Sequence, residues 1–329
     1  MTTQTLPRLS FAPLEGITGW VFRQVHQRRF PGLDRYYAPF FAPTTDSPLT
    51  GRGLADLQPD HNQGVPVVPQ LLANQAEAFL AAARVLQDLG YTEINLNLGC
   101  PSGTVVAKGK GAGFLAHPQA LDAFLSDIFS RTDLAISIKT RIGVEEEGEW
   151  PALLAIFRRY PIRELIIHPR LRRDFYRGPV RQGAFQYAVD HCDLPLCYNG
   201  DLFTPQACRE LAAQFPSVSH WMAGRGLVYN PALGRQLQGG EPLTPEELRA
   251  FHDQLVEAYR QVLSGDRPVL GKMKELWFYW SRHFLQPEGP LKRIRKAKTL
   301  LEYRDGVNAL FRDCPFQEEG PVTFNLPRR

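Results

Sequence analysis

Ile94-Asn95-Leu96-Asn97-Leu98-Gly99-Cys100-Pro101-Ser102 reads as a strand that runs into a turn. Apolar and polar residues alternate along its first half, which is typical of a strand, and Gly99 and Pro101 cannot extend a sheet. The stretch therefore places a thiol, Cys100, just past the carboxyl end of a strand, with Asn97 three residues before it. For an isolated cysteine a buried structural role is the ordinary interpretation. The rest of the chain decides between that interpretation and a chemical one.

A loop rich in glycine and lysine follows the thiol, Lys108-Gly109-Lys110-Gly111-Ala112-Gly113. Glycine loses more backbone entropy on folding than other residues, so three glycines in five residues carry a cost. We expect either mobility of this loop or the close approach of a ligand to offset that cost.

Length and composition limit the classes of protein to which this chain can belong. The 329 residues suffice for one large domain and a small one, and 43% of them are hydrophobic. The net charge of +4 suits a polyanionic partner, but many enzymes with small substrates share it.

The five cysteines form no CxxC pair, which argues against a zinc site or a disulfide framework. No stretch resembles a secretory signal or approaches the roughly 20 apolar residues of a membrane helix. We expect a soluble, cytoplasmic, monomeric protein with no metal and no membrane contact.

Short apolar runs alternate with helical patterns along most of the chain. Strands are predicted at residues 9–14, 36–41, 66–71, 94–98, 135–140, 164–168, 195–199 and 218–223. Helices are predicted at 18–30, 75–89, 118–129, 150–160, 182–189, 205–214 and near 231–237, with a long polar connection at 44–64. Strict alternation over eight units predicts an α/β fold, a (β/α)8 TIM barrel. The alternative is a doubly wound sheet, which needs a Gly-rich phosphate turn after its first strand, where this chain has Pro13-Leu14-Glu15-Gly16.

The pattern changes after Gly239-Gly240, where strand signals end. Helical spacing predicts three helices, at 242–264, 269–284 and 291–311, the second rich in aromatic residues. We therefore expect a catalytic barrel over residues 1–240, an all-helical domain over 241–312, and an extended Pro-rich tail over 313–329.

Polar residues and glycines gather at the predicted strand ends. In a (β/α)8 barrel the carboxyl ends of all strands meet at one rim, where active sites lie. The residues at these ends are Pro13, Leu14, Glu15, Gln70, Asn97, Cys100, Lys139, Arg141, His168, Arg170, Asn199, Gly200, Asp201, Gly224 and Arg225. Because a purely structural barrel has no reason to make one rim polar, we predict an active site there.

Two of these strand ends suggest the ligand. Asn199-Gly200-Asp201 and Gly224-Arg225-Gly226 follow the seventh and eighth strands, where barrels bind phosphate, although ordinary tight turns are the alternative. Lys139 needs an anionic partner to be tolerated at mid-barrel. A flavin N1–C2=O edge is such a partner, and His168 can donate a second hydrogen bond to it.

Six segments stand in the order found in the tRNA-dihydrouridine synthases, which this chain resembles from residue 9 to residue 237. They are Ala12-Pro13-Leu14-Glu15-Gly16, Asn97-Leu98-Gly99-Cys100-Pro101-Ser102, Ser137-Ile138-Lys139-Thr140-Arg141, His168-Pro169-Arg170, Asn199-Gly200-Asp201 and Ala223-Gly224-Arg225-Gly226. The helical domain is similar to the RNA-binding extension of that family. The turns after strands seven and eight are shared with other flavin barrels.

The resemblance implies a flavoenzyme that holds FMN without a covalent bond and uses NADPH to reduce it. Hydride would pass to C6 of a uridine in tRNA, and Cys100 would protonate C5. FMN would be held by Pro13, Leu14, Glu15, Gln70, Lys139, His168, Asn199, Gly200, Asp201, Gly224 and Arg225. Asn97, Arg141, Arg170 and Tyr176 would lie against the substrate.

Departures from the family pattern and basic segments leave alternatives open. Leu171 stands where the family usually has Thr, and the loop at 104–108 differs from its relatives. The arginines of segment 170–181 contact phosphates or form a solvated loop. The basic residues predicted to contact tRNA are Lys292, Arg293, Arg295, Lys296 and Lys298, with a solvated helix as the alternative.

Two other functions compete with this interpretation. The first is an FMN barrel that reduces a small molecule, of the dihydroorotate dehydrogenase or enoate reductase type, which has no use for a basic helical extension. The second is a tRNA-binding protein without catalysis, which predicts a colourless preparation. No local motif reports which uridine is reduced, because that choice depends on how the helical domain orients the tRNA.

Overall fold

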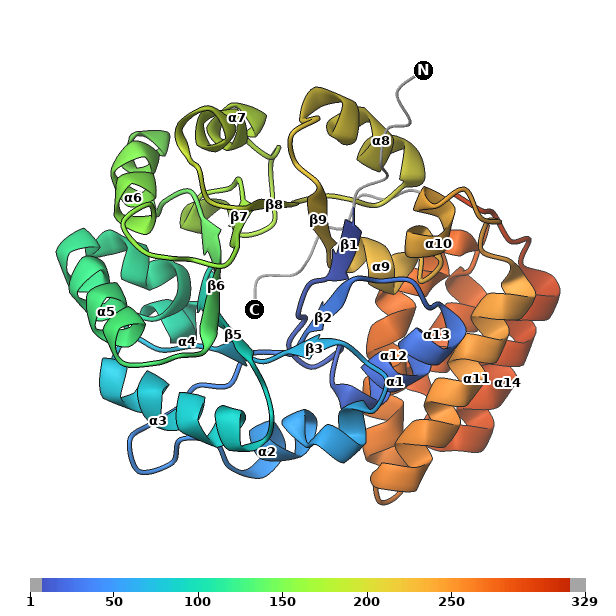
Figure 1. Ribbon diagram of the computed structural model, residues 1–329. Helices are drawn as coiled ribbons and strands as arrows, with labels where there is room; N and C mark the ends of the chain where they lie inside the picture. Colours follow the sequence, from blue (N-terminus) through green and yellow to red (C-terminus); the bar gives the residue numbers. More distant parts are fainter. Residues whose placement is uncertain (1–7, 320–329) are drawn as a thin grey trace.

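The computed structural model describes residues 8–319, and its strands form one sheet that closes into a barrel (Figure 1). Nine parallel strands make up the sheet, in the order β3-β2-β1-β9-β8-β7-β6-β5-β4. They are β1 Arg8–Phe11, β2 Arg35–Tyr37, β3 Val67–Val68, β4 Gln70–Leu71, β5 Glu93–Leu98, β6 Ala135–Arg141, β7 Leu165–His168, β8 Leu196–Asn199 and β9 His220–Ala223. The predicted (β/α)8 barrel is confirmed. Predictions for residues 1–7 and 320–329 lie outside the described residues.

Pro69 explains why nine strands appear where eight were predicted. Proline has no N–H to donate to the ladder, so it divides the third predicted strand in two. The first half pairs with β2 and the second half with β5, at the two ends of the sheet. The Pro69 carbonyl still accepts a hydrogen bond from the Asn95 N–H at 2.8 Å. The barrel therefore closes through the chain itself, across one proline.

Helices surround the barrel (Figure 1), and their apolar residues are buried. Phe79 of α3 and Phe124 of α5 show how these helices also contact one another, with ring centroids 6.0 Å apart in an edge-to-face arrangement. The surrounding helices are α1 Trp20–Arg29, α3 Ala76–Asp88, α5 Pro118–Ser130, α6 Trp150–Phe157, α7 Gln182–His191 and α8 Pro205–Gln214, and the short α9 Arg225–Tyr229 and α10 Leu233–Leu237 follow β9.

The predicted polar connection at 44–64 is wrong in part, because it contains α2 Gly51–Leu57 and a 3-10 turn at Pro59–Asn62. A buried arginine on α1 organises this insertion. The Arg23 guanidinium donates to Asp56 Oδ2 and to Asn62 Oδ1, each at 2.9 Å. These contacts join residues more than 30 positions apart, so no local pattern reports them.

The region after the barrel is all helical, as predicted, but its helices differ in number. It contains α11 Pro245–Val262, α12 Asp266–Trp280, α13 Glu288–Lys296 and α14 Leu300–Asp313. The single helix predicted at 291–311 is therefore wrong. Thr299 ends it because its side chain caps the next helix, accepting a hydrogen bond from the Glu302 N–H. A Cβ on Gly306 would lie 3.0 Å from Ile294, so the two halves pack closely as a hairpin.

Figure 1 shows the helical region against one side of the barrel. Aromatic residues from both regions pack together there. Phe251 of α11 meets Phe22 of α1 and Phe30, just after that helix, at centroid distances of 5.7 and 5.3 Å. Trp280 of α12 donates its indole N–H to the Val228 carbonyl of α9 at 2.8 Å. The two regions thus share one apolar core. Within residues 8–319, no helix has both the length and the apolar character needed to cross a membrane.

Gly226 provides a test of the barrel rim. A Cβ at this position would lie 1.8 Å from the Leu202 carbonyl oxygen, so the backbone after β9 approaches the backbone after β8 directly. Gly226→Ala is expected to lower the free energy of unfolding by about 2–3 kcal/mol or more, measured by urea denaturation. Gly183→Ala is the control, since that exposed helical glycine faces open space and should change stability by no more than about 1 kcal/mol, upward. Equal unfolding midpoints for the two variants would contradict the close approach.

Candidate active site

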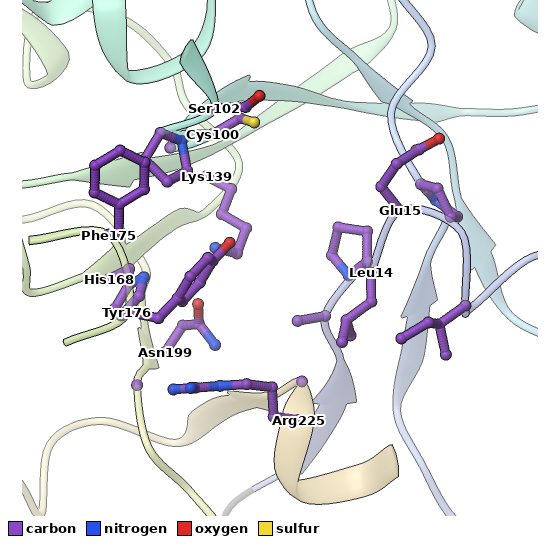
Figure 2. A pocket seen from close by; sticks show the side chains of 18 of the residues that line it. Leu14, Glu15, Cys100, Ser102, Lys139, His168, Phe175, Tyr176, Asn199 and Arg225 are labelled. Carbon is purple, nitrogen blue, oxygen red and sulfur yellow. The ribbon is translucent and has the colours of Figure 1, made fainter. Parts of the chain in front are cut away.

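One large cavity opens at the carboxyl rim of the barrel, with a volume of about 1440 Å³ (Figure 2). Ends of strands from around the barrel contribute to its wall. The predicted site residues that line it are Pro13, Leu14, Glu15, Gln70, Asn97, Cys100, Lys139, Arg141, His168, Tyr176, Asn199, Gly200, Asp201, Gly224 and Arg225. Polar side chains from distant parts of the sequence therefore share one pocket, as expected if the carboxyl ends of the strands meet at one rim.

The turn that carries Cys100 is held by the side chain of Asn97. Asn97 Oδ1 accepts hydrogen bonds from the backbone N–H groups of Gly99 and Cys100, at 3.0 and 2.9 Å. Behind the turn, a Cβ on Gly111 would lie 2.8 Å from the Cys100 carbonyl oxygen. The glycine at that position allows the protein's own backbone to approach, whereas the sequence suggested mobility or a ligand. Gly111 also has φ +57°, which favours glycine.

Burial raises the pKa of the Cys100 thiol. Arg141 and Lys139 act in the opposite direction, by stabilising a thiolate, but they do not outweigh burial. The thiol consequently remains protonated at neutral pH. Figure 2 shows its sulfur at the edge of the cavity, on the same side as Lys139.

Lys139 lies beside Asn97 across the β5–β6 ladder and points into the cavity (Figure 2). Burial, together with repulsion from Arg141, lowers the pKa of Lys139 to about 8. No salt bridge to Lys139 is present among residues 8–319. A half-buried ammonium group without a carboxylate is costly, so this position suits a ligand with an electron-rich edge.

His168 is held neutral beside the same cavity. Burial lowers the pKa of its imidazole well below the usual value, and the surrounding cations Arg141 and Lys139 lower it further. The Arg170 guanidinium lies 3.1 Å from His168 Nε2. Since a guanidinium only donates, Nε2 is the acceptor and the proton sits on Nδ1. His168 is thus a neutral hydrogen-bond donor through Nδ1.

Asp201 lies between two arginines at the end of β8. Arg170 donates to its two carboxylate oxygens at 3.1 and 2.5 Å, and Arg225 donates to Oδ1 at 2.6 Å. Two guanidinium groups share one carboxylate, so the cluster keeps a net positive charge at the predicted phosphate position. Arg170 is only 1% exposed and does not line the cavity, so its visible role is to orient Asp201 and His168.

Arg141 connects two rim segments through backbone carbonyls. Its guanidinium donates to the carbonyls of Gly99, Leu171 and Phe175, at 2.8, 2.8 and 2.6 Å. The Tyr176 ring lies 5.3 Å from the Arg141 guanidinium and 5.2 Å from that of Arg225. Arg141 therefore fixes the Cys100 turn against the loop that places Tyr176 in the cavity, and its guanidinium also faces that ring.

The basic segment 170–181 separates into two groups. Arg172 pairs with Glu145, and Arg181 pairs with Asp174 and Glu147. Arg173 and Arg177 line the cavity mouth with exposed side chains, and neither forms a salt bridge with any described residue. The first group is a structural network, and only the second group is available to phosphates.

The predicted tRNA-contacting cations lie away from the cavity. Leu291 and Ile294 of α13 are buried, and this orientation leaves the charged residues exposed. The exposed residues are Lys292, Arg293, Arg295 and Lys296 on α13 and Lys298 just after it. Together they form a solvent-facing basic surface on the helical region.

Sequence reasoning missed the contribution of α12 to the cavity. Gly271, Lys274, Glu275, Phe278 and Tyr279 of this helix line the wall. The aromatic richness of the segment was visible in the sequence, but the side of the helix that meets the barrel was not. The helical region is therefore part of the pocket itself.

A second buried cluster, at the amino-terminal ends of the strands, was also missed. His220 Nε2 lies 2.6 Å from Ser10 Oγ, and its Nδ1 lies 2.5 Å from Glu164 Oε1. Together with Cys197 these groups place three potential metal ligands within 4.8 Å of one another. Hydrogen bonds already use both imidazole nitrogens, and burial raises the pKa of the Cys197 thiol well above its usual value, which opposes metal binding.

A closed (β/α)8 barrel that gathers a thiol, an ammonium group and a neutral imidazole in one rim pocket has the fold and the site of an enzyme. The family described as dihydrouridine synthase (Dus) matches residues 10–281, and this chain belongs to that family. It is a flavin-dependent oxidoreductase, as the members of that family are.

Relatives agree with this assignment, and a solved structure shares the fold. A probable tRNA-dihydrouridine synthase of Staphylococcus epidermidis is 30% identical over 239 residues, 69% of this chain and 71% of the relative. A tRNA-dihydrouridine(16) synthase of Cupriavidus necator is 29% identical over 320 residues, 90% of this chain and 95% of the relative. The old yellow enzyme from Trypanosoma cruzi shares the fold alone, with a TM-score of 0.50 and 10% identity over 78% of this chain and 94% of its own.

Arg141 offers a test of the rim. Arg141→Lys keeps the charge but replaces a three-way donor by one ammonium group, so at least one buried carbonyl loses its partner. The free energy of unfolding is expected to fall by about 2–4 kcal/mol, measured by urea denaturation. Arg177→Lys, at an exposed position on the loop whose carbonyls Arg141 binds, is the matched control and is expected to be neutral. A variant at position 141 as stable as this control would show that the three contacts do not hold the rim together.

Proposed function

We propose that this protein is a tRNA-dihydrouridine synthase, which reduces the C5=C6 bond of particular uridines in tRNA to 5,6-dihydrouridine, with FMN as bound cofactor and NADPH as reductant. The observation that carries the proposal is the shared pocket of Cys100 and Lys139, on neighbouring strands, in a chain of the dihydrouridine synthase family. The relatives named above as tRNA-dihydrouridine synthases support tRNA as the substrate.

The residues of the pocket fit FMN. Lys139 supplies an ammonium group without a carboxylate partner, which suits the electron-rich N1–C2=O edge of a flavin. His168 offers an Nδ1–H donor beside it. Arg225, sharing Asp201 with Arg170, leaves net positive charge for a phosphate. When bound and reduced, the flavin supplies a hydride to C6 of the uracil.

Cys100 supplies the proton that completes the reduction. Addition of hydride at C6 leaves an electron pair at C5, delocalised onto the adjacent carbonyl, and a positioned acid must protonate C5. The thiol remains protonated because burial raises its pKa, so Sγ–H gives its proton to C5 and recovers another from solvent. Asn97 orients the thiol, since its amide oxygen holds the Cys100 N–H.

A uridine can enter the rim pocket only after it leaves its base stack, as bases do in base-flipping enzymes. The phosphates around it then require cations at the mouth. Arg173 and Arg177 supply these at the barrel, and the basic surface of α13 supplies more at a distance. We assign the barrel, residues 1–240, to catalysis and the helical region, 241–312, to tRNA binding, in a cytoplasmic monomer.

Loss of the thiol is the first test of this function. Cys100→Ala is expected to lower the rate of dihydrouridine formation by about 10²–10⁴-fold, while flavin content and NADPH-dependent flavin reduction stay unchanged. The assay compares tRNA from cells lacking the gene after complementation with each variant, and dihydrouridine is mapped by mass spectrometry. Cys192→Ala, outside the cavity, is the control. An unchanged dihydrouridine map in cells lacking the gene would refute the assignment.

Lys139 gives a pH dependence with a defined sign. A negative edge of FMN would raise the pKa of Lys139 above its value of about 8 in the free protein, so binding gains from the ammonium form below that pH. This gain is lost as pH rises through the pKa of the bound form. FMN affinity, measured by quenching of flavin fluorescence, is therefore expected to fall about tenfold between roughly pH 7 and pH 9.5. Lys139→Met should give a weaker and flat profile, and a flat profile for the unmodified protein would contradict this role.

A further inference from the structure

A chain of buried amide groups runs through the barrel beneath the pocket. Asn97 Nδ2 donates to Gln70 Oε1 at 2.8 Å, and Gln70 Nε2 donates to Asn95 Oδ1 at 2.7 Å. Asn95 Nδ2 then donates to Ser137 Oγ at 3.0 Å. Gln70, Asn95 and Ser137 are each fully buried. Only Gln70 and Asn97 reach the cavity wall, so the other two residues form a layer below it.

Strand register creates this layer. Gln70 and Asn95 are direct partners across β4 and β5, and Asn95 and Ser137 are direct partners across β5 and β6. Two residues further along the same strands, Asn97 is the partner of Lys139. Inner layers of such barrels are usually filled by branched apolar residues. Three polar side chains in one layer are tolerated only because each hydrogen-bonds the next.

The direction of the chain of hydrogen bonds is fixed at its upper end. The backbone N–H groups of Gly99 and Cys100 can only donate, so Asn97 must present its oxygen to them and its NH2 group to Gln70. Gln70 must then present its oxygen to Asn97 and its NH2 group to Asn95. The Asn95 oxygen accepts from that NH2 group and so holds the Gln70 amide in this orientation from below, as Asn97 does from above.

We propose that Asn95, supported by Ser137, is a positioning residue for the proton-donating turn: it holds the Gln70 and Asn97 amides in the one orientation that fixes Cys100. The inference rests on the function proposed above for its catalytic consequence. Asn95 does not reach the pocket and has no chemical role there. Its effect reaches the thiol through two amides.

The experiment uses three variants of the full-length holoenzyme. Asn95→Leu removes the acceptor for Gln70 at similar volume, and Ser137→Ala removes only the acceptor for Asn95. Ser10→Ala is the matched control, since Ser10 is also a fully buried strand serine, but its hydroxyl bonds His220 in the other cluster. Should Asn95→Leu fail to fold, Ser137→Ala carries the test alone.

Two readouts separate positioning from general stability. Hydrogen exchange at the Gly99 and Cys100 amides, followed by mass spectrometry of a peptide spanning 98–102, is expected to accelerate roughly tenfold in Asn95→Leu and less in Ser137→Ala. The kcat for dihydrouridine formation is expected to fall about 10–100-fold in Asn95→Leu, with KM for tRNA and flavin reduction by NADPH unchanged.

The control variant decides the outcome. Ser10→Ala is expected to lose stability without faster exchange at residues 99 and 100 and without a loss of kcat. If Asn95→Leu and Ser137→Ala leave exchange and kcat no different from Ser10→Ala, the amides do not position the turn and the proposal is overturned. If the unmodified enzyme makes no dihydrouridine, the proposed function fails, while the exchange measurement still tests the positioning.

Discussion

The register between β5 and β6 is the constraint on which the site depends. It places Asn97 opposite Lys139, and two residues earlier it places Asn95 opposite Ser137. Because side chains alternate across a strand, a slip of β5 by one residue would turn Asn95 and Asn97 away from the barrel interior, while Ser137 and Lys139 stayed in place. Neither the chemical groups of the pocket nor the amides beneath them could then meet. Burial of the alternate residues Ile94, Leu96 and Leu98 against the outer helices opposes such a slip.

The fold and most of the pocket could be predicted because both follow from local patterns. Alternation of strands and helices specifies the barrel, and the parallel arrangement brings the ends of the strands together whatever their distance in the chain. Two of the misses have local causes: Pro69 divides a strand that pairs on both sides, and Thr299 divides a helix by capping the next one through Glu302. The third has a long-range cause, because Arg23 binds Asp56 in the segment that was expected to be an irregular connection.

What the sequence did not show is which partner each polar side chain would take. Arg170 was expected near the substrate, yet it lies behind the pocket wall, where Asp201, His168 and the Gly178 carbonyl occupy its donors. The cluster of Ser10, Glu164 and His220 joins β1, the residue just before β7, and β9. Hydrogen-bond partners of this kind depend on the closed barrel, and no spacing within one segment encodes them.

The position of α12 has a consequence for how selectivity can change over evolutionary time. This helix lines the pocket on one side and is anchored on the other through Trp280 and its bond to Val228. Contacts on both sides of α12 therefore fix the position of this wall against the barrel. Relatives that act on different nucleotides can therefore differ in the individual side chains that line this wall, without a change in the interface between the helical region and the barrel.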